Sequence, residues 1–176
     1  ISISADGFIV ATGAYSNNGN GTDSGQVRVY KYNSATSSWT QLGADIYGSA
    51  GDYSGPVSLS SDGSRLAIGS YGNDGTNGNS SNMGTVRIYD YNGSAWVQLG
   101  ANIDGEATGD ISGVSVSLSS NGTRVAIGAS ANRGGGSSGS LMGQVRIYDY
   151  NGSAWVKVGQ DIDGKAGYFV VDSITL

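Results

Sequence analysis

The chain has 176 residues and a formal net charge of −5; 31 residues are glycine and one is proline. Because it holds no histidine and no cysteine, the usual zinc site, a Cys–His nucleophile and a Ser–His–Asp triad are excluded. The acidic balance argues against nucleic acid or an anionic membrane as a partner, and no apolar run reaches the roughly 20 residues that span a bilayer.

Self-similarity organises the whole chain. A motif that reads QVRVYKYN from Gln26 returns as TVRIYDYNGSAW from Thr85 and as QVRIYDYNGSAW from Gln144. Further motifs recur in the same order, so the chain consists of three copies of a unit of about 59 residues. We therefore expect repeats over 1–57, 58–116 and 117–166, followed by an extra C-terminal strand over 167–176.

Each unit predicts four short strands, illustrated here by the third copy. Residues 114–118 alternate between apolar and polar side chains, which is typical of a half-buried strand. Further strands are expected over 124–128, 145–150 and 155–158, and Asn121-Gly122 between the first two favours a two-residue type I′ hairpin turn, as does Asp62-Gly63 in the second copy. No segment has a helical period. The predicted fold is all-β, with tandem four-stranded antiparallel repeats that form β-propeller-like blades.

The third strand of each unit carries tyrosine at two positions. Six of the eleven tyrosines lie there, namely Tyr30, Tyr32, Tyr89, Tyr91, Tyr148 and Tyr150. Apolar side chains alternate with Arg and Tyr along this strand, so neither face is plainly polar. A blade between two neighbours needs contact residues on both faces, and we interpret the tyrosines as packing layers with arginine stacked on their rings. An aromatic ladder that binds a ligand is the alternative.

A family resemblance rests on these same motifs. The succession SVSLSSNGTRVAIGA, a Gly/Asn-rich loop and then GQVRIYDYNG resembles the FG-GAP repeats of integrin-type β-propellers. This resemblance implies an extracellular or cell-surface module that acts in adhesion through protein–protein contacts. Many FG-GAP repeats carry a calcium loop with alternating aspartates, whereas the corresponding turns here offer only Asp6, Asp62 and Asn121. They cannot supply the roughly six to eight oxygens that calcium requires, so no metal and no cofactor are expected.

The number of repeats bears on the partners of the chain. Three units are few for a closed propeller, which has about four to eight blades. Open repeat ends present unpaired strand edges, and such edges recruit other chains. We therefore expect protein partners or a second copy of the chain itself, in a homo-oligomer or a filament.

The long loops at 14–25, 70–84 and 129–143 differ most among the copies and are rich in Asn, Gly and Ser. Loops on a rigid scaffold commonly carry binding residues, and their polar side chains suit sugar hydroxyls; a solvated or glycosylated loop is the alternative. The candidate binding residues are Asn73, Asp74, Asn77, Asn132 and Arg133. Candidate N-glycosylation sites, from the Asn-x-Ser/Thr pattern, are Asn20, Asn79, Asn92, Asn121 and Asn151.

Two groups of residues share part of a catalytic pattern. Ser137 lies in a Gly-x-Ser-x-Gly run, but the chain offers no histidine as its base. Several acids could act in pairs as in a glycosidase, or hold calcium weakly: Glu106, Asp104, Asp110, Asp161 and Asp163. Solvated loop acids are the favoured interpretation.

The sequence therefore predicts a non-enzymatic extracellular structural or adhesive module that acts through protein–protein contacts and self-assembles, with no catalytic residue. A carbohydrate-binding module that uses the variable loops is the alternative, and a glycosidase is the third hypothesis.

Overall fold

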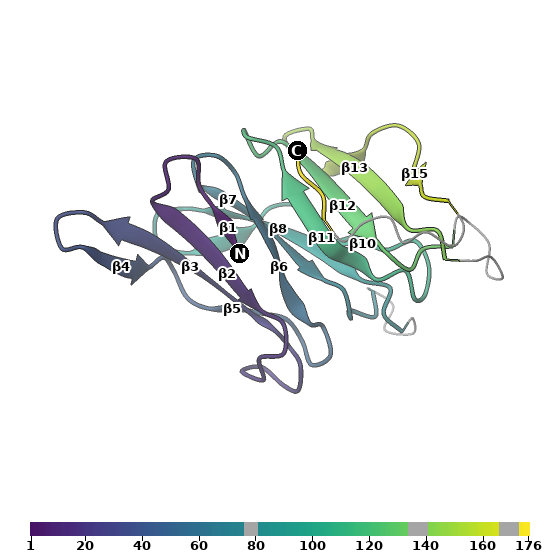
Figure 1. The fold of residues 1–176 in the computed structure, drawn as a ribbon, viewed down its shortest axis with the longest axis horizontal. Helices are drawn as coiled ribbons and strands as arrows, with labels where there is room; N and C mark the ends of the chain where they lie inside the picture. Colours follow the sequence, from purple (N-terminus) through teal and green to yellow (C-terminus); the bar gives the residue numbers. More distant parts are fainter. Residues whose placement is uncertain (76–80, 134–140, 166–172) are drawn as a thin grey trace.

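A computed structural model describes residues 1–75, 81–133, 141–165 and 173–176, and in these ranges all regular structure is β-strand. Three five-stranded antiparallel sheets follow one another along the chain. Figure 1 shows them side by side, from the purple N-terminal sheet to the yellow-green third one. The all-β prediction, with repeated four-stranded antiparallel units in a propeller-like arrangement, is confirmed.

The three sheets, here called blades, have the same plan. The first blade comprises β1 (Ser2–Ile3), β2 (Ile9–Ala14), β3 (Gln26–Asn33), β4 (Ser38–Gln41) and β5 (Ile46–Tyr47). The second comprises β6 (Ser54–Leu59), β7 (Arg65–Ser70), β8 (Thr85–Tyr91), β9 (Trp96–Gln98) and β10 (Ile103–Asp104). The third comprises β11 (Ser112–Leu118), β12 (Arg124–Ala129), β13 (Gln144–Tyr150), β14 (Trp155–Lys157) and β15 (Ile162–Asp163).

The last strand of each blade escaped the sequence analysis. β5, β10 and β15 each pair with one end of the third strand of the blade, while β4, β9 and β14 pair with its other end. Each of these extra strands has two residues. A segment this short contains no alternation for a period-two pattern to reveal.

The turns between the first and second strands differ from the expected type. A type I′ turn needs positive φ at both central residues, but in Asp62-Gly63 and Asn121-Gly122 it is the glycine that has it, at 69° in both cases. The Asp62 side chain instead accepts a hydrogen bond from the Ser64 backbone N–H at 2.9 Å, and Asn121 does the same for Thr123 at 3.0 Å. The prediction of a hairpin at these dipeptides is right, and the turn type is wrong.

The hydrophobic core lies between blades. One cluster joins Val27 and Val29 of the first blade to Leu66 and Ile68 of the second. The other joins Val86, Ile88 and Ile103 of the second blade to Val125 and Ile127 of the third. Because both clusters mix side chains from two sheets, the blades stabilise one another, as in other repeat proteins.

Glycine allows the blades to approach closely. Gly13 in β2 faces the backbone of Gly55 in β6, and Gly69 in β7 faces that of Gly113 in β11. At Gly69, a Cβ atom would overlap the carbonyl group of Gly113. Two equivalent pairs of glycines thus set the separation of the backbones, one pair at each junction.

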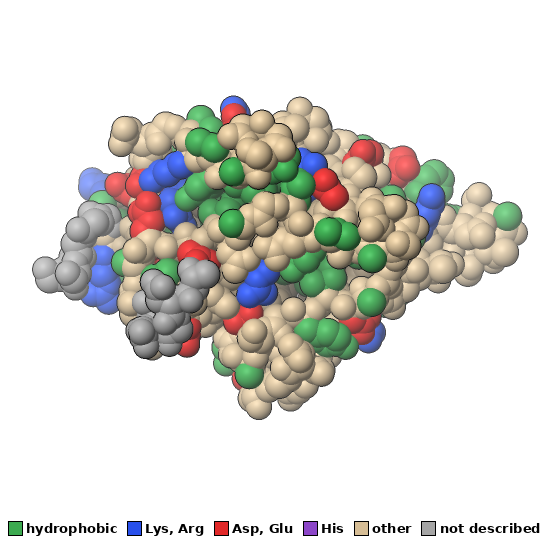
Figure 2. All heavy atoms as spheres, turned by 180° about the vertical axis from the view of Figure 1, so that it is seen from behind, with side chains coloured by type: hydrophobic (Ala, Val, Ile, Leu, Met, Phe, Trp, Pro, Cys, Tyr) green, Lys and Arg blue, Asp and Glu red, His purple; other side chains and the backbone are tan. Residues whose placement is uncertain are grey.

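Backbone and uncharged side chains cover much of the face shown in Figure 2. On the face shown in Figure 2, Lys and Arg side chains lie next to Asp and Glu, with apolar side chains between these groups. No helix in the described part of the chain is long and apolar enough to cross a membrane. Most of the C-terminal strand expected over 167–176 falls on 166–172, outside the described residues, and Ser173–Leu176 has no assigned strand.

We expect Gly69→Ala to lower the free energy of unfolding by about 1–3 kcal/mol, because overpacking at a close backbone contact forces the blades apart. Gly51→Ala is the matched control: its Cβ would meet open space, and only the positive φ of 81° penalises it, at about 1 kcal/mol. Urea denaturation measures both. A loss for Gly69→Ala below that of the control would contradict the close approach of the blades.

Candidate functional site

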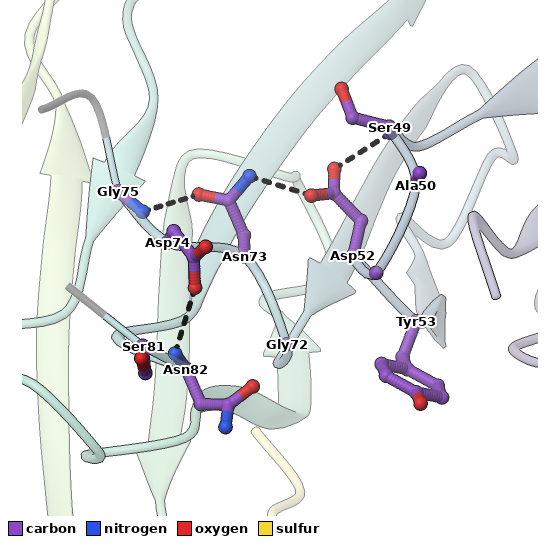
Figure 3. Close-up of a pocket in the computed structure, with 11 residues that line it drawn as sticks. Ser49, Ala50, Asp52, Tyr53, Gly72, Asn73, Asp74, Gly75, Ser81 and Asn82 are labelled. Atoms are coloured by element: carbon purple, nitrogen blue, oxygen red, sulfur yellow. Dashed lines mark hydrogen bonds between the residues drawn. The ribbon is translucent and has the colours of Figure 1, made fainter. Parts of the chain in front are cut away.

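A pocket of about 450 Å³ lies at the junction of the first and second blades. Its walls are residues 49–53, in the connection from β5 to β6, and residues 72–75 and 81–82, in the loop from β7 to β8. Figure 3 shows Asp52 and Tyr53 on one side, and Asn73, Asp74 and Asn82 on the other. The pocket therefore exists only where two loops that are distant in sequence meet.

Asp52 holds the two walls together. Its side chain accepts hydrogen bonds from the Ser49 backbone N–H at 2.9 Å and from the Asn73 amide at 2.8 Å. It also accepts one from the Arg87 guanidinium at 3.1 Å, and the Asp52 side chain is only 4% exposed. The Asn73 side-chain oxygen in turn accepts a hydrogen bond from the Gly75 backbone N–H at 2.8 Å (Figure 3). Because its oxygens are occupied by these donors, Asp52 has a structural role.

Asp74 is the exposed carboxylate of the pocket. Its Oδ1 accepts a hydrogen bond from the Asn82 backbone N–H at 3.0 Å, which fixes the side chain across the loop (Figure 3). On the opposite wall, the Tyr53 hydroxyl donates to Asp23 at 3.1 Å, and this hydrogen bond and the charge of Asp23 raise the pKa of Tyr53. Among the described residues that line the pocket, none is Lys or Arg.

The second junction repeats the buried aspartate with different partners. Asp110 is 3% exposed and accepts hydrogen bonds from the backbone N–H groups of Ala107 at 2.8 Å and Glu106 at 3.2 Å. Arg146, the counterpart of Arg87, is also 3% exposed and donates to the Ser112 hydroxyl at 2.9 Å. Arg146 also donates to the Asp104 carbonyl of β10 at 3.0 Å, so it ties the third blade to the second, whereas Arg87 ties the second blade to the connection that precedes it.

The structure brings two of the predicted binding residues together, Asn73 and Asp74, which both line the pocket. Asn132 is buried, and Arg133 is exposed in the loop of the third blade. Asn77 lies outside the described residues. Sequence analysis missed Asp52 and Tyr53, although the repeated run Gly-Asp-x-Ser-Gly, at 51–55 and 109–113, could have drawn attention to them.

The acids singled out in the sequence are partly brought together around Lys157. The Lys157 ammonium lies 3.0 Å from Glu106 and also contacts Asp161, and these two hydrogen-bonded acids raise its pKa. Asp163 accepts a hydrogen bond from Gln144 at 3.3 Å, and Asp104 accepts one from Thr85 at 2.6 Å. Within the described ranges, no group of three or more acidic side chains is placed to hold a metal ion.

The candidate glycosylation sites that the structure describes are exposed, and three of them form turns. The side-chain oxygens of Asn92, Asn121 and Asn151 each accept a hydrogen bond from the backbone N–H two residues later, at 3.0 Å. The Asn20 amide donates to the Gly48 carbonyl at 2.9 Å, and Asn79 lies outside the described residues. Glycosylation of these sites stays a prediction.

Arg28, the counterpart of Arg87 in the first blade, has a partner within its own blade. Its guanidinium makes two hydrogen bonds of 3.0 Å to the Asp45 carboxylate. The hydrogen bonds from Arg28, and then from Gln41, lower the pKa of Asp45 from its ordinary value of 3.8 to about 2. This ion pair is a property of the first blade alone.

Comparison with known proteins supplies fold neighbours. No family model and no curated protein matches the chain. A solved structure of a 6-phosphogluconolactonase from Bacteroides fragilis is similar, with a TM-score of 0.56 and 13% identity, over 89% of this chain and 39% of that one. A periplasmic gluconolactonase, PpgL, from Pseudomonas aeruginosa has a TM-score of 0.41 and 12% identity, over 95% of this chain and 58% of that one. The chain thus spans less than two thirds of either protein, and at 13% identity the likeness to the Bacteroides fragilis structure establishes the fold alone.

These comparisons correct the interpretation of the sequence. The FG-GAP assignment is wrong, because the similar solved structure from Bacteroides fragilis is described as a 6-phosphogluconolactonase and no family model matches. The predictions of a non-enzymatic adhesive module that assembles into filaments, and of a carbohydrate-binding module, are overturned with it, because that similar structure is described as an enzyme. The resemblance rested on short turn and strand motifs. These motifs follow from the blade architecture, which unrelated repeat-β proteins share.

We expect Asp52→Asn to destabilise the protein by about 3 kcal/mol, because it leaves the mostly buried Arg87 guanidinium without its charged partner. Asp149→Asn is the control: it makes the same change in the Arg124–Asp149 pair, whose side chains are 47% and 42% exposed, and such pairs contribute little. Chemical denaturation distinguishes the two. Equal losses would show that Asp52 does not hold the junction.

We expect Arg28→Ala to raise the pKa of Asp45 from about 2 towards 3.8, since the guanidinium is the largest cause of the lowered value. A lowered folded-state pKa stabilises the protein above pH 3.8, and this contribution is lost as the pH falls towards 2. A carboxyl-carbon NMR titration of Asp45 in both proteins measures the shift. An unchanged midpoint would contradict the ion pair.

Proposed function

We propose that this chain forms part of a β-propeller hydrolase that opens small uncharged lactones in the pocket between the first and second blades. The observation that carries the proposal is the exposed Asp74 carboxylate, held by the Asn82 N–H at the pocket wall. The fold supports it, because a lactonase is the described activity of a similar solved structure. A location outside the cytoplasm, expected from the sequence, is compatible at that coarse level with the periplasmic neighbour.

The charge of the pocket favours a neutral substrate. Its lining carries the carboxylates of Asp52 and Asp74, with Asp23 behind Tyr53, and no cationic side chain. Arg87 already balances the Asp52 charge, so a phosphorylated or carboxylated ligand would place its negative charge next to the exposed Asp74 carboxylate without a cation of its own. Hydroxyl, amide and backbone groups line the remaining wall and suit the hydroxyls of a polyhydroxylated ring. The volume of about 450 Å³ accommodates such a small ring.

The proposed reaction needs one general base and hydrogen-bond donors for the carbonyl oxygen. A water molecule beside Asp74 attacks the lactone carbonyl while its proton passes to the Asp74 carboxylate. The negative oxygen of the tetrahedral intermediate accepts hydrogen bonds from donors at this wall, for which the Ser81 hydroxyl and the Asn82 amide are the candidates. The ring C–O bond then breaks, and protonated Asp74 returns the proton to the ring oxygen. Lactone and water thereby become one hydroxy acid.

Asp52 is unsuited to the same task although it shares the pocket. Its oxygens already accept hydrogen bonds from Ser49, Asn73 and Arg87. Taking up a proton there would disrupt the contacts that hold the loops. The two carboxylates therefore divide into a structural group and a reactive group.

We expect Asp74→Asn to lower kcat/KM for gluconolactone by about 100-fold or more, because the amide cannot accept the proton from water. A pH-stat assay of acid release, corrected for spontaneous hydrolysis, measures the rate. Asp163→Asn is the matched control, since it removes the same charge from the third blade, and we expect it to leave the rate unchanged. Hydrolysis at the background rate by the unmodified protein would disprove the proposed function, and full activity of Asp74→Asn would disprove the role of Asp74.

A further inference from the structure

Tryptophan joins each blade to the one before it. The Trp96 indole N–H of the second blade donates to the Leu42 carbonyl of the first at 3.0 Å. Trp155 of the third blade donates to the Leu99 carbonyl of the second at the same distance. Beside each acceptor lies a glycine whose absent Cβ leaves room for the indole. A Cβ at Gly43 or Gly100 would stand 3.1 Å from the Trp Cδ1 atom.

The third blade carries the same acceptor position without a tryptophan against it. The Val158 N–H donates a hydrogen bond to the Ile147 carbonyl, just as the Leu99 N–H donates to the Ile88 carbonyl. Val158 is therefore the counterpart of Leu99. A Cβ built on the adjacent Gly159 would have nothing within 4 Å. Within the described residues, the far side of the third blade thus offers a free place for an indole ring.

Side-chain exposure shows the same vacancy. Ile103 of β10 is 6% exposed because the third blade covers it, whereas its counterpart Ile162 of β15 is 59% exposed. Arg65 of β7 is 17% exposed and donates to the Gly122 carbonyl of the next blade at 2.9 Å. Its counterpart Arg124 is 47% exposed. The third blade covers these two side chains of the second blade. The equivalent side chains of the third blade are open to solvent.

One strand of a further blade is already in place. The Leu59 N–H donates to the Ser2 hydroxyl of the preceding blade at 2.9 Å, and Leu118 donates to Ser58 in the same way. The Leu176 N–H makes the equivalent bond to Ser117 of the third blade, also at 2.9 Å. Ser173–Leu176 runs along β11 next to the label C in Figure 1. It occupies the position that β6 and β11 hold against their own preceding blades.

We propose that the far face of the third blade, formed by Ser117, Val158, Gly159 and Ile162, is the docking surface for a fourth copy of this repeat, whose innermost strand is Ser173–Leu176. The remaining strands of that copy cover Ile162, and a tryptophan equivalent to Trp155 donates its indole N–H to the Val158 carbonyl. The two existing junctions supply the geometry of this contact.

A second copy of the chain does not fit this surface. Its first blade would bring its own innermost strand, Ser2–Ile3, to the place that Thr175 and Leu176 already occupy. The surface instead requires a sheet that lacks this strand and supplies the four that lie outside it. The occupant is therefore a fourth copy of the repeat that packs its outer strands beside Ser173–Leu176.

The experiment appends a copy of residues 119–165 directly after Leu176, because Leu176 is the counterpart of Leu118. The chain has no cysteine, so Ile162→Cys introduces a single thiol on the proposed surface. We expect the appended blade to slow modification of this thiol by an aromatic disulfide reagent at least about tenfold. Val97→Cys, on a β9 residue that is 51% exposed, is the matched control and should react equally fast with and without the appended copy.

Two outcomes would overturn the proposal. The same sequence already forms β12 to β15 on the second blade, so an unchanged rate at residue 162 would show that the third blade does not receive a further copy. Light scattering on the Ile162→Cys chain without the appended blade, together with its thiol reactivity, provides the other test. A dimer in which the thiol at residue 162 is protected without any appended blade would assign the surface to a second copy of the chain.

Discussion

The packing of one blade against the next is the contact on which the rest of the structure depends. Each hydrophobic cluster takes side chains from two sheets, such as Val29 with Leu66, or Ile88 with Ile127. A single blade of this size cannot bury enough apolar surface by itself, so stability arises at the junctions. The glycine pairs and the indole hydrogen bonds act at these same junctions, where they set the separation of the sheets and their register.

The pocket is a consequence of this packing. Asp52 precedes the second blade and Asn73 lies within it, and the Arg87 side chain reaches from β8 to bind Asp52. A carboxylate used for such a structural purpose cannot also exchange protons with a substrate without loosening the junction. The exposed Asp74, only one residue from Asn73, does not hold the junction together, and for this reason the proposed chemistry rests on it.

The FG-GAP resemblance failed for a physical reason. Its quoted motifs consist of an Asn-Gly turn, a buried Val-Ala-Ile segment and a Tyr-bearing third strand, and the structure assigns all three to turn geometry and interblade packing. Such residues are dictated by the form of a blade and are available to any chain that builds one. Residues that distinguish one propeller function from another lie instead in loops, where the three copies differ.

The sequence by itself determined the repeats, the four main strands of each blade and the positions of the hairpins, because alternation and turn residues are local properties. It also placed Asn73 and Asp74 in a candidate binding loop. Only the tertiary structure decided that Asp52, 21 residues before Asn73, shares a pocket with them, because loop contacts between blades leave no periodic signal. It likewise decided that Ile103 is covered and Ile162 exposed. These two residues occupy equivalent strands, and the presence of a neighbouring blade alone makes the difference.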